Sequence, residues 1–368
     1  MVNCGSTSLK VASFAGGNPE AVAWSATVSA DALGDDRVAG IETVLRASPV
    51  AFERVGAVGH RIVHGADRFA VPVRVDGDVE AAIMSIAGLA PLHNRAGLDG
   101  VAAARRVVGP SAVHVAVFDT SFHQTLAASA YAYGGPHEWI DRGLRRYGFH
   151  GISHQHAVAT AAGLLGRPLI ELALVTCHLG GGCSLAAVAG GRSIDTTMGL
   201  TPLDGLVMGT RSGSVDPALV LHLIRTGTPI DEVEHILEHE SGLLGLSGVS
   251  ADLPDVIAAR DAGAPDAALA VDVFVHRVAT GVGAMIAALG RLDAIVFTGG
   301  IGEHSAEVRA RVTKQLASFG AQLDSTRNQR AVGDSIVSTD DAAVAVLVVT
   351  AREEAAIAKA VFELIGSR

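Results

Sequence analysis

The stretch from Asp195 to Pro217 contains residue types that bind anions on loops. It reads DTTMGLTPLDGLVMGTRSGSVDP, and its four glycines together with Pro202 leave no room for a long helix. Arg211 is the only cation in this stretch. The planar guanidinium of an arginine on such a loop is suited to grip a carboxylate or a phosphate. A surface loop whose arginine meets solvent is the alternative interpretation, and the stretch alone leaves both open.

Two more charged candidates stand at the ends of apolar runs. Residues 54–64 read RVGAVGHRIVH and deliver Arg61 near the end of a predicted strand, and residues 112–118 read AVHVAVF and are followed by Asp119. A charge in an apolar strand is costly to bury without a partner, so Arg61 is expected either to form an ion pair or to point at a ligand. Asp119 stands where α/β sheets place catalytic groups, but the N-cap of a helix through residue 125 fits equally well.

Two histidines lie beside predicted helix starts. His93 precedes a predicted helix over residues 98–107, and His150 precedes a predicted helix over residues 154–165, which Ser153 can cap. The dipole at a helix start favours anions, which makes His150 a candidate for contact with a phosphate or carboxylate. A lone histidine at a helix start is more often structural than catalytic, and that is the simpler interpretation of His93.

Glycine-rich turns recur along the chain. Residues 2–8 (VNCGSTS) and 178–184 (HLGGGCS) each join two predicted strands, and such hairpins offer backbone N–H groups to phosphates. An ordinary β-turn is the alternative, but one such hairpin in each half suggests an internal duplication. A third loop, residues 298–305 (TGGIGEHS), follows a predicted strand at 294–297 and precedes a predicted helix at 306–319. That arrangement suits a nucleotide, although a glycine loop by itself is a weak signal.

Two acidic residues follow the last predicted strand, residues 344–349. Glu353 and Glu354 open a terminal helix that runs to residue 365. Acidic residues in a first helical turn commonly only complement the helix dipole. Because these two also follow a core strand, metal binding by one of them is the alternative.

The composition of the whole chain narrows the function classes. Of 368 residues, 49% are hydrophobic and 18% are charged, which is ample material for two domain cores. The formal net charge of −10 argues against a nucleic-acid surface. Three widely spaced cysteines fit neither a disulfide framework nor a zinc site, which favours a reducing cytoplasm. The longest apolar runs, such as residues 278–290, are too short for a membrane span, so no membrane partner is expected.

These features together describe an α/β protein in two halves whose parts suit phosphoryl transfer. Arginines on loops and strand ends hold charged oxygens, acids at strand ends hold a divalent cation, and glycine turns surround a nucleotide with N–H groups. The predicted long apolar helix over residues 272–289 supplies core for the second half.

The same motifs, in the same order, resemble those of the acetate kinase family, which belongs to the actin-like ATPase fold group together with sugar kinases. The matching segments span nearly the full chain: NCGSTSLK (3–10), GHRIVHG (59–65), PLHN (91–94), FDTSFHQT (118–125), RRYGFHG (145–151), MGLTPLDGLVMGTRSG (198–213) and FTGGIGE (297–303). The resemblance implies an α/β fold of two actin-like domains, with duplicated ribonuclease-H-like halves and a cleft between them. It places residues 1–121 and 355–368 in the first domain and residues 122–354, with the nucleotide-binding loops, in the second.

The resemblance also implies an activity. A phosphoryl group passes reversibly from ATP to acetate and gives acetyl phosphate and ADP, with Mg²⁺, or Mn²⁺ in its place, as the metal. It implies a homodimer as well. A kinase for propionate or butyrate is one alternative, which only the volume of the acyl pocket decides. A degenerate nucleotide-binding paralogue with little catalysis is the other.

Single residues receive roles by the same resemblance. Asp119 would position the metal and the carboxylate, and His150 would donate to the phosphoryl oxygens. The implied catalytic set is Asp119, Arg61, Arg211 and His150, in which the two arginines hold the carboxylate and the transferring phosphoryl group. The implied substrate contacts are Arg61, His93 and an apolar wall of Val63, Leu92, Phe149 and Pro202.

The remaining implied roles concern the nucleotide and the metal. The phosphate contacts would be Ser6, Ser8 and Lys10 in the first hairpin and His178, Leu179, Gly180, Gly181 and Gly182 in the second. The adenosine would lie against Gly299, Gly300, Ile301 and Gly302. The metal ligands would be Asn3 and Glu353, with Glu354 as the alternative to Glu353.

Four positions depart from the residues usual in that family. Gly181 stands at a usual asparagine, Arg95 at a proline, Ile152 at a threonine and Ser214 at an acid. The segment between residues 10 and 59 is also shorter than usual. The glycine at 181 lacks a side-chain donor to the nucleotide phosphates, which is expected to weaken ATP binding about tenfold.

Overall fold

The computed structural model describes residues 1–5, 8–16, 18–86 and 91–366, the last range without the side chains of residues 91–93. The chain divides into two compact units. The first unit contains Met1–Gln124, Phe149–His156 and Arg352–Arg368, and the second contains Thr125–Gly148 and Ala157–Ala351. This grouping assigns residues 122–124, 149–156 and 352–354 to the first unit, whereas the division expected from the sequence assigned them to the second.

The first unit is built on a six-stranded sheet in the order β3-β2-β1-β4-β6-β5. Its strands are β1 (Val2–Cys4), β2 (Ser8–Phe14), β3 (Val22–Ser29), β4 (Ala57–Ile62), β5 (Val73–Arg74) and β6 (Val113–Phe118). The hairpins β1–β2 and β2–β3 are antiparallel, β1, β4 and β6 run parallel, and β5 closes the edge antiparallel to β6. The carboxyl ends of β4 and β6 therefore lie side by side.

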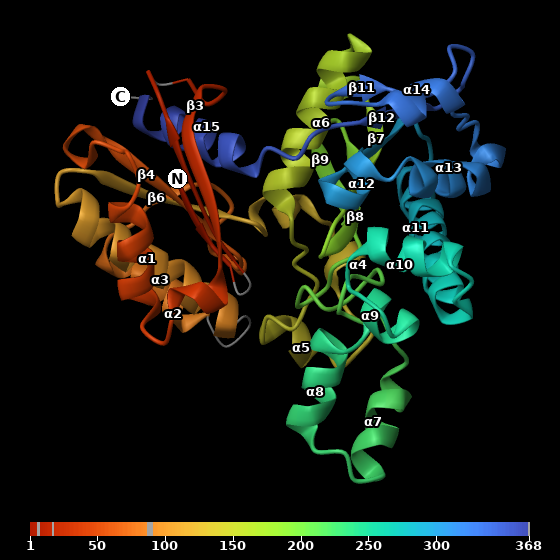
Figure 1. Ribbon diagram of the computed structural model, residues 1–368, viewed down its shortest axis with the longest axis horizontal. Helices are drawn as coiled ribbons and strands as arrows, with labels where there is room; N and C mark the ends of the chain where they lie inside the picture. Colours follow the sequence, from red (N-terminus) through yellow and green to blue (C-terminus); the bar gives the residue numbers. More distant parts are fainter. Residues whose placement is uncertain (6–7, 17, 87–90, 367–368) are drawn as a thin grey trace. The chain divides into compact units, whose positions relative to one another are not determined.

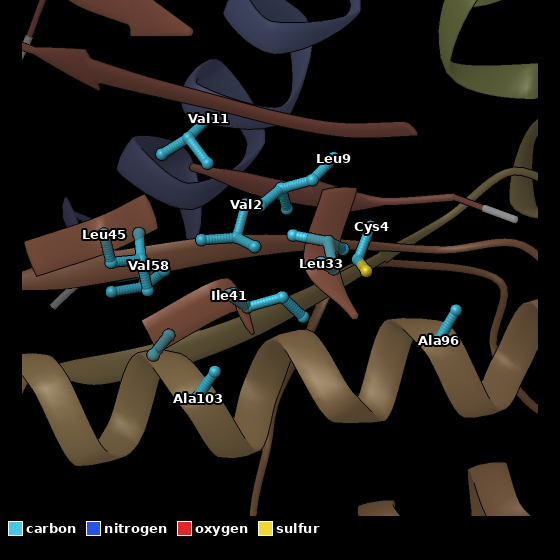
Figure 2. Packing of buried hydrophobic residues seen from close by; sticks show 11 residues of the cluster. Val2, Cys4, Leu9, Val11, Leu33, Ile41, Leu45, Val58, Ala96 and Ala103 are labelled. Atoms are coloured by element: carbon cyan, nitrogen blue, oxygen red, sulfur yellow. The ribbon is translucent and has the colours of Figure 1, made fainter. Parts of the chain in front are cut away.

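Helices cover both faces of this sheet. One core packs α1 (Arg37–Arg46) and α3 (Pro91–Val108) against β1, β2 and β4, and Figure 2 shows its buried side chains between sheet and helices. A second core packs α15 (Glu353–Gly366) against β6. Figure 1 shows α15 on the face opposite α1, α2 (Gly77–Ser85) and α3. Short 3-10 turns complete the unit: η1 (Ala30–Leu33), η2 (Phe52–Arg54) and η4 (Ser121–Thr125).

The second unit repeats this topology. Its sheet, read from β9, runs β9-β8-β7-β10-β12-β11, and each strand has the place and direction of its counterpart in the first unit. The strands are β7 (Ala173–Leu179), β8 (Cys183–Ala189), β9 (Arg192–Thr196), β10 (Ala294–Thr298), β11 (Ser335–Ile336) and β12 (Ala345–Val348). The duplication expected from the two glycine hairpins is confirmed.

The helix α11 (Pro265–Leu289) is the central helix of the second unit. Ten of its residues are buried, and it packs on β7, β8 and β9. By length and composition this helix is apolar enough to cross a membrane, with a mean hydropathy of 1.5 and half of its apolar window buried within the protein. The expectation that every apolar run is too short for a span therefore fails for α11, although its buried face is that of a core helix.

The other helices of this unit surround the sheet and its loops. They are α4 (Ala128–Tyr131), α5 (Glu138–Asp141), α7 (Pro217–Arg225), α8 (Ile230–His239), α9 (Gly242–Ser247), α10 (Leu253–Asp261), α12 (Gly299–His304), α13 (Ala306–Gln315) and α14 (Ser325–Arg330), with η5 (Leu169–Glu171) and η6 (Ala317–Phe319). The helix α6 (Gly151–Leu165) begins in the first unit and ends in the second. Residues 197–216 contain neither helix nor strand, as their glycines predict.

The bounds of several helices differ from those expected: α11 begins at Pro265 and not at residue 272, and α13 ends at Gln315 and not at residue 319. The helix expected from residue 154 begins at Gly151, so Ser153 is buried inside α6 and does not cap it. The helix expected from residue 98 begins at Pro91, which suits the first turn because proline lacks the N–H that this turn leaves unpaired. The Gly-Gly-x-Gly segment expected as a loop is the short helix α12.

Candidate functional site

The ends of β4 and β6 bring an arginine and an aspartate together. Arg61 Nε donates to Asp119 Oδ1 at 3.1 Å, and Nη2 donates to Oδ2, which makes a bidentate pair. The side chain of Asp119 is 1% exposed and that of Arg61 is 17% exposed. The sequence also allowed Asp119 to be a helix N-cap. In the structure both of its carboxylate oxygens accept hydrogen bonds from Arg61. Arg61 Nη1 also donates to Asn3 Oδ1 at 3.4 Å.

The charges around this pair favour a bound cation. Burial works to lower the pKa of Arg61, but the carboxylates of Asp119, Glu353 and Glu354 outweigh it and the pKa is raised. Burial raises the pKa of Asp119, Glu353 acts in the same direction, and Arg61 opposes both. The negative charges of Asp119 and Glu353 therefore repel each other, and a nearby cation would relieve that repulsion.

The donor set of this site fits Mg²⁺. Asp119 and Glu353 offer carboxylate oxygens, and Asn3, which is 5% exposed, offers a carboxamide oxygen. Among the described residues no group of three or more histidine, cysteine, aspartate or glutamate side chains gathers.

The two acids at the start of α15 have different surroundings. Glu354 Oε1 lies 4.0 Å from Lys10 Nζ, and both side chains are partly exposed. Glu353 is the one whose charge reaches Asp119. These surroundings favour Glu353 over Glu354 as the metal-side carboxylate.

The backbone around His150 is tied to Asp119. His150 has a φ of +56°, in the left-handed region that non-glycine residues rarely adopt. The next residue, Gly151, donates its N–H to the carbonyl of Asp119 at 2.8 Å, and a Cβ at Gly151 would lie 2.2 Å from that carbonyl oxygen. Only glycine permits this approach, so Gly151 fixes the loop of His150 next to Asp119. Strain at such a residue is typical of functional sites.

The residues expected to line an acyl pocket are distributed over both units. Val63 and Phe149 are buried in the first unit, and the ring of Phe149 meets the ring of His64 edge-on at 5.4 Å. Pro202 lies in the second unit. Leu92 and His93 belong to the first turn of α3, but their side chains lie outside the described residues.

The first hairpin is held by an arginine that the sequence did not single out. The N–H of Gly5 donates to the carbonyl of Ser8 at 2.9 Å across the turn, and Asn3 pairs with Lys10 in the ladder. Arg37 Nη2 donates to the carbonyl of Gly5 at 2.7 Å and to Cys4 Sγ at 3.3 Å.

No local pattern marks Arg37, which is simply the first residue of α1. Ser6, an expected phosphate contact at the tip, lies outside the described residues.

The second hairpin is held by backbone contacts. His178 and Leu179 belong to β7, and the turn itself is Gly180–Gly182. Gly180 donates its N–H to the carbonyl of Gly182 at 3.1 Å, and Gly209 donates to the carbonyl of Gly181 at 3.1 Å. The turn is therefore tied to the loop that carries Arg211.

Helix α12 begins directly against this turn. Gly299 has a φ of +78°, and a Cβ there would lie 2.8 Å from the carbonyl oxygen of Leu179. Gly300 and Ile301 continue the helix, and the carbonyl of Gly302 accepts from Arg309 Nη1 at 2.9 Å.

Arg309 is 1% exposed and also donates hydrogen bonds to the carbonyl of Glu303 and to Asn328, so it holds α12 in place. No local pattern in the sequence indicates this role, because its partners come from two separate segments, residues 302–303 and residue 328.

Arg211 lies on its loop between contacts of the same unit. Its Nη1 donates to the carbonyl of Pro202 at 2.9 Å, and its charge acts on the thiol of Cys183 in the second hairpin. Burial raises the pKa of Cys183 to about 12, so this thiol is inert. Nearby, Ser214 Oγ donates to Asp204 Oδ1 at 2.5 Å. Ser214, which stands where the family usually has an acid, therefore has a structural partner.

A cavity of about 690 Å³ lies within the second unit, lined by α9, α11 and part of the Arg211 loop. It contains none of the residues expected in the site. Its wall includes Arg146, Asp195 and Glu240. The volume of this cavity therefore does not mark it as the candidate site, which remains the group of residues around Arg61 and Asp119.

Comparisons with known proteins identify the family and the fold of this chain. The model of the Acetokinase family matches residues 38–359. An acetate kinase from Gloeobacter violaceus is 50% identical over 319 residues, which cover 86% of this chain and 78% of that protein. The crystal structure of Porphyromonas gingivalis acetate kinase superposes with a TM-score of 0.88 at 33% identity, covering 99% of this chain and 98% of the other.

A propionate kinase from Francisella tularensis superposes equally well. Its TM-score is 0.88 at 34% identity, with coverage of 98% of this chain and 97% of the other. These neighbours share the two-unit α/β, actin-like fold. On the family model, the close relative and the fold together, this chain belongs to the acetokinase family.

Proposed function

We propose that this chain transfers a phosphoryl group reversibly from ATP to acetate and forms acetyl phosphate and ADP. The observation that carries the proposal is the bidentate pair of the half-buried Arg61 and the buried Asp119, with Asn3 and the charge of Glu353 beside it. The relatives named acetate kinase support it, because they cover most of the chain.

The chemistry suits a site without a strong general base. A carboxylate is already ionised at neutral pH, so it attacks the phosphoryl group without losing a proton. The protein must neutralise charge and align the reactants. Arg61 in the first unit and Arg211 in the second are the proposed cations for the carboxylate and the phosphoryl oxygens. His150 is the proposed additional donor.

The proposed metal is Mg²⁺, with Mn²⁺ as the alternative. Asp119, Asn3 and Glu353 would hold it, and when bound it neutralises charge on the nucleotide phosphates. The nucleotide phosphates themselves would contact the turns of both hairpins, where glycines expose backbone N–H groups. Gly299 to Gly302 would face the adenosine.

Propionate is the second candidate substrate. The Francisella tularensis propionate kinase is as similar in fold as the acetate kinase, so fold similarity does not separate the two acids. The buried Val63 and Phe149 would form part of the wall that decides between them. A homodimer located in the cytoplasm completes the proposal, in line with the family resemblance.

The test is phosphorylation of a series of acids. Purified protein is incubated with Mg·ATP and acetate, propionate or butyrate, and the acyl phosphate is trapped with hydroxylamine. Hydroxamate that depends on the acid is expected, with acetate giving the highest kcat/KM. Asp119→Ala is expected to abolish it. Asp340→Ala removes an exposed carboxylate paired with Arg327 and serves as the matched control.

Two results would count against the proposal in different ways. Preferred turnover of propionate would replace acetate by the second candidate. Absence of product with every acid, in protein that still binds ATP, would leave a nucleotide-binding paralogue as the better account.

A further inference from the structure

The loop that follows β4, residues 63–66, is held by a side chain of α3. Asn94 Oδ1 accepts from the N–H of His64 at 3.0 Å, and Asn94 Nδ2 donates to the carbonyl of His64 at 2.9 Å. Both residues are 0% exposed. The carboxamide of Asn94 thus pairs with both the N–H and the carbonyl of His64. In a sheet, a neighbouring strand would make these two hydrogen bonds.

Two residues after β6 hold the rest of the loop. Thr120 Oγ1 accepts from the N–H of Gly65 at 3.0 Å, and Gln124 Nε2 donates to the carbonyl of Ala66. Thr120 is 0% exposed. We call Asn94, Thr120 and Gln124 the loop clasp.

Together with contacts inside the loop and from the turn after it, the loop clasp gives every backbone N–H and carbonyl of residues 64–66 a partner. The N–H of Ala66 donates to His64 Nδ1 at 2.9 Å. The carbonyl of Gly65 accepts from the N–H groups of Arg68 at 3.3 Å and Phe69 at 3.2 Å. A buried loop must satisfy its polar groups in this way, and here side chains rather than a strand ladder do most of it.

The loop also stores strain. Ala66 has a φ of +49°, one of two non-glycine residues with positive φ among the described residues, and the other is His150. Such conformations persist only where the surroundings over-determine them, and they cluster at functional sites. The loop clasp supplies that determination at Ala66.

The loop meets the acyl side of the proposed site. Val63, its first residue, is 5% exposed. The ring of His64 packs edge-on against Phe149 at 5.4 Å. Val63 and Phe149 are the two residues of the first unit with described side chains that are proposed to line the acyl pocket. A shift of the loop therefore changes the space between those walls.

We infer that the loop clasp consists of positioning residues that set the size of the acyl pocket and so determine which short carboxylate is phosphorylated. This inference rests on the proposed function. The clasp residues act through Val63 and His64, not on the reacting atoms. One methylene group more or less in an apolar pocket commonly changes kcat/KM by about tenfold or more, so a small displacement is measurable as acid selectivity.

The first test replaces one hydroxyl in the full-length protein. Thr120→Val keeps the shape of the side chain and removes the acceptor for Gly65. We expect the ratio of kcat/KM for propionate over acetate to rise about fivefold, which is less than the discrimination that a whole methylene group gives in an apolar pocket. The KM for ATP is expected to stay unchanged. Thr120→Ser keeps the hydroxyl and is expected to restore the wild-type ratio.

Two further variants separate positioning from stability. Thr313→Val is the matched control, because Thr313 is a buried threonine of the second unit whose hydroxyl has no hydrogen-bond partner among the described residues. Gln124→Leu removes the contact to Ala66 at a half-buried position and tests the clasp if Thr120→Val does not fold. It is expected to shift the ratio in the same direction.

The outcomes are distinct. A lowered melting temperature in Thr120→Val and Gln124→Leu with an unchanged acid ratio would reduce the clasp to a structural role and overturn the inference alone. A ratio that shifts equally in Thr313→Val would also overturn it. A wild-type protein that phosphorylates none of the acids would overturn the proposed function, and the inference with it.

Discussion

The β1–β2 hairpin and the β7–β8 hairpin occupy the same place in two copies of one sheet, yet their turns are held differently. Charged side chains surround the first turn: Arg37 holds the carbonyl of Gly5, and Lys10 pairs with Glu354. The second turn is Gly180–Gly182, which is held by its own backbone, by Gly209 and by the neutral thiol of Cys183, which donates to the carbonyl of Gly180 at 3.2 Å.

The difference extends to the strands that follow. In the first unit β4 and β6 end in the pair of Arg61 and Asp119. In the second unit β10 leads into Gly299 and the short helix α12. The duplicated framework therefore carries side-chain charges at one set of strand ends and glycine-rich backbone at the other. Side-chain charges suit a carboxylate and a metal, and backbone donors suit nucleotide phosphates.

The largest effect is expected from removing a charge of the first unit. Asp119→Asn keeps the size of the side chain but loses the ion pair with Arg61. We expect kcat to fall by about 10²–10³-fold, as for other groups that stabilise charge in the transition state. ATP affinity, measured by fluorescence titration, is expected to change little, because the second unit supplies most backbone donors.

An equal loss of ATP affinity in Asp119→Asn would break this comparison, since it would give both units the same role. Asp340→Asn, on an exposed pair far along the chain, controls for a general effect of lost charge.

The sequence predicted the framework well, because strands and glycine turns are local patterns. Asp119 and Arg61 were expected at strand ends and lie there. The predicted start of α6 was wrong. The helix begins at Gly151, three residues before the expected residue 154, because Gly151 approaches the carbonyl of Asp119 closely.

The contacts that hold the site could not be predicted from the sequence, because they join residues that are far apart in the chain. Arg37, Asn94 and Arg309 act on partners 32, 30 and 19 residues away in sequence, and no spacing rule marks such pairs. A buried polar residue becomes informative only when its partner is known.

The second largest effect is expected at the second hairpin. A Cβ at Gly181 meets nothing within 4 Å, so a larger side chain fits there without displacement. Gly181→Asn adds a donor toward the nucleotide phosphates, and we expect the Kd for ATP to fall about tenfold. Isothermal titration measures it.

Gly163→Asn is the matched control, because that glycine is also open and lies in α6. Unchanged or weaker ATP binding in Gly181→Asn alone would argue that this turn does not face the phosphates.

A smaller effect is expected when the first hairpin loses its brace. Arg37→Gln removes the contacts to Gly5 and Cys4 while keeping a polar side chain at the start of α1. We expect the KM for ATP to rise about fivefold, the net effect of one hydrogen bond, with kcat nearly unchanged. Arg46→Gln, exposed in the last turn of the same helix, should leave both constants as they are. A KM that ignores Arg37→Gln would mean that the turn holds its shape without help.

The smallest effect at neutral pH, which grows on acidification, is expected from a histidine pair present in the first sheet only. His60 Nε2 and His114 Nδ1 lie 2.9 Å apart on β4 and β6, whereas the equivalent strands β10 and β12 read AIVFT and AVLV. Burial lowers the pKa of both histidines, that of His114 to about 4, and the nearby charge of Arg105 acts in the same direction.

The unfolded chain therefore binds more protons than the folded one as the pH falls below about 6.5. The first unit should lose stability from that pH toward about 4, by at most about 1.4 kcal/mol per pH unit for each histidine. The two tryptophans allow each unit to be followed separately, because Trp24 lies in the first and Trp139 in the second. Denaturant titrations of Trp139→Phe and Trp24→Phe proteins at several pH values should show the acid-sensitive transition only where Trp24 remains. Adding His114→Gln should flatten it, and parallel transitions in both units would assign the acid sensitivity to something other than this pair.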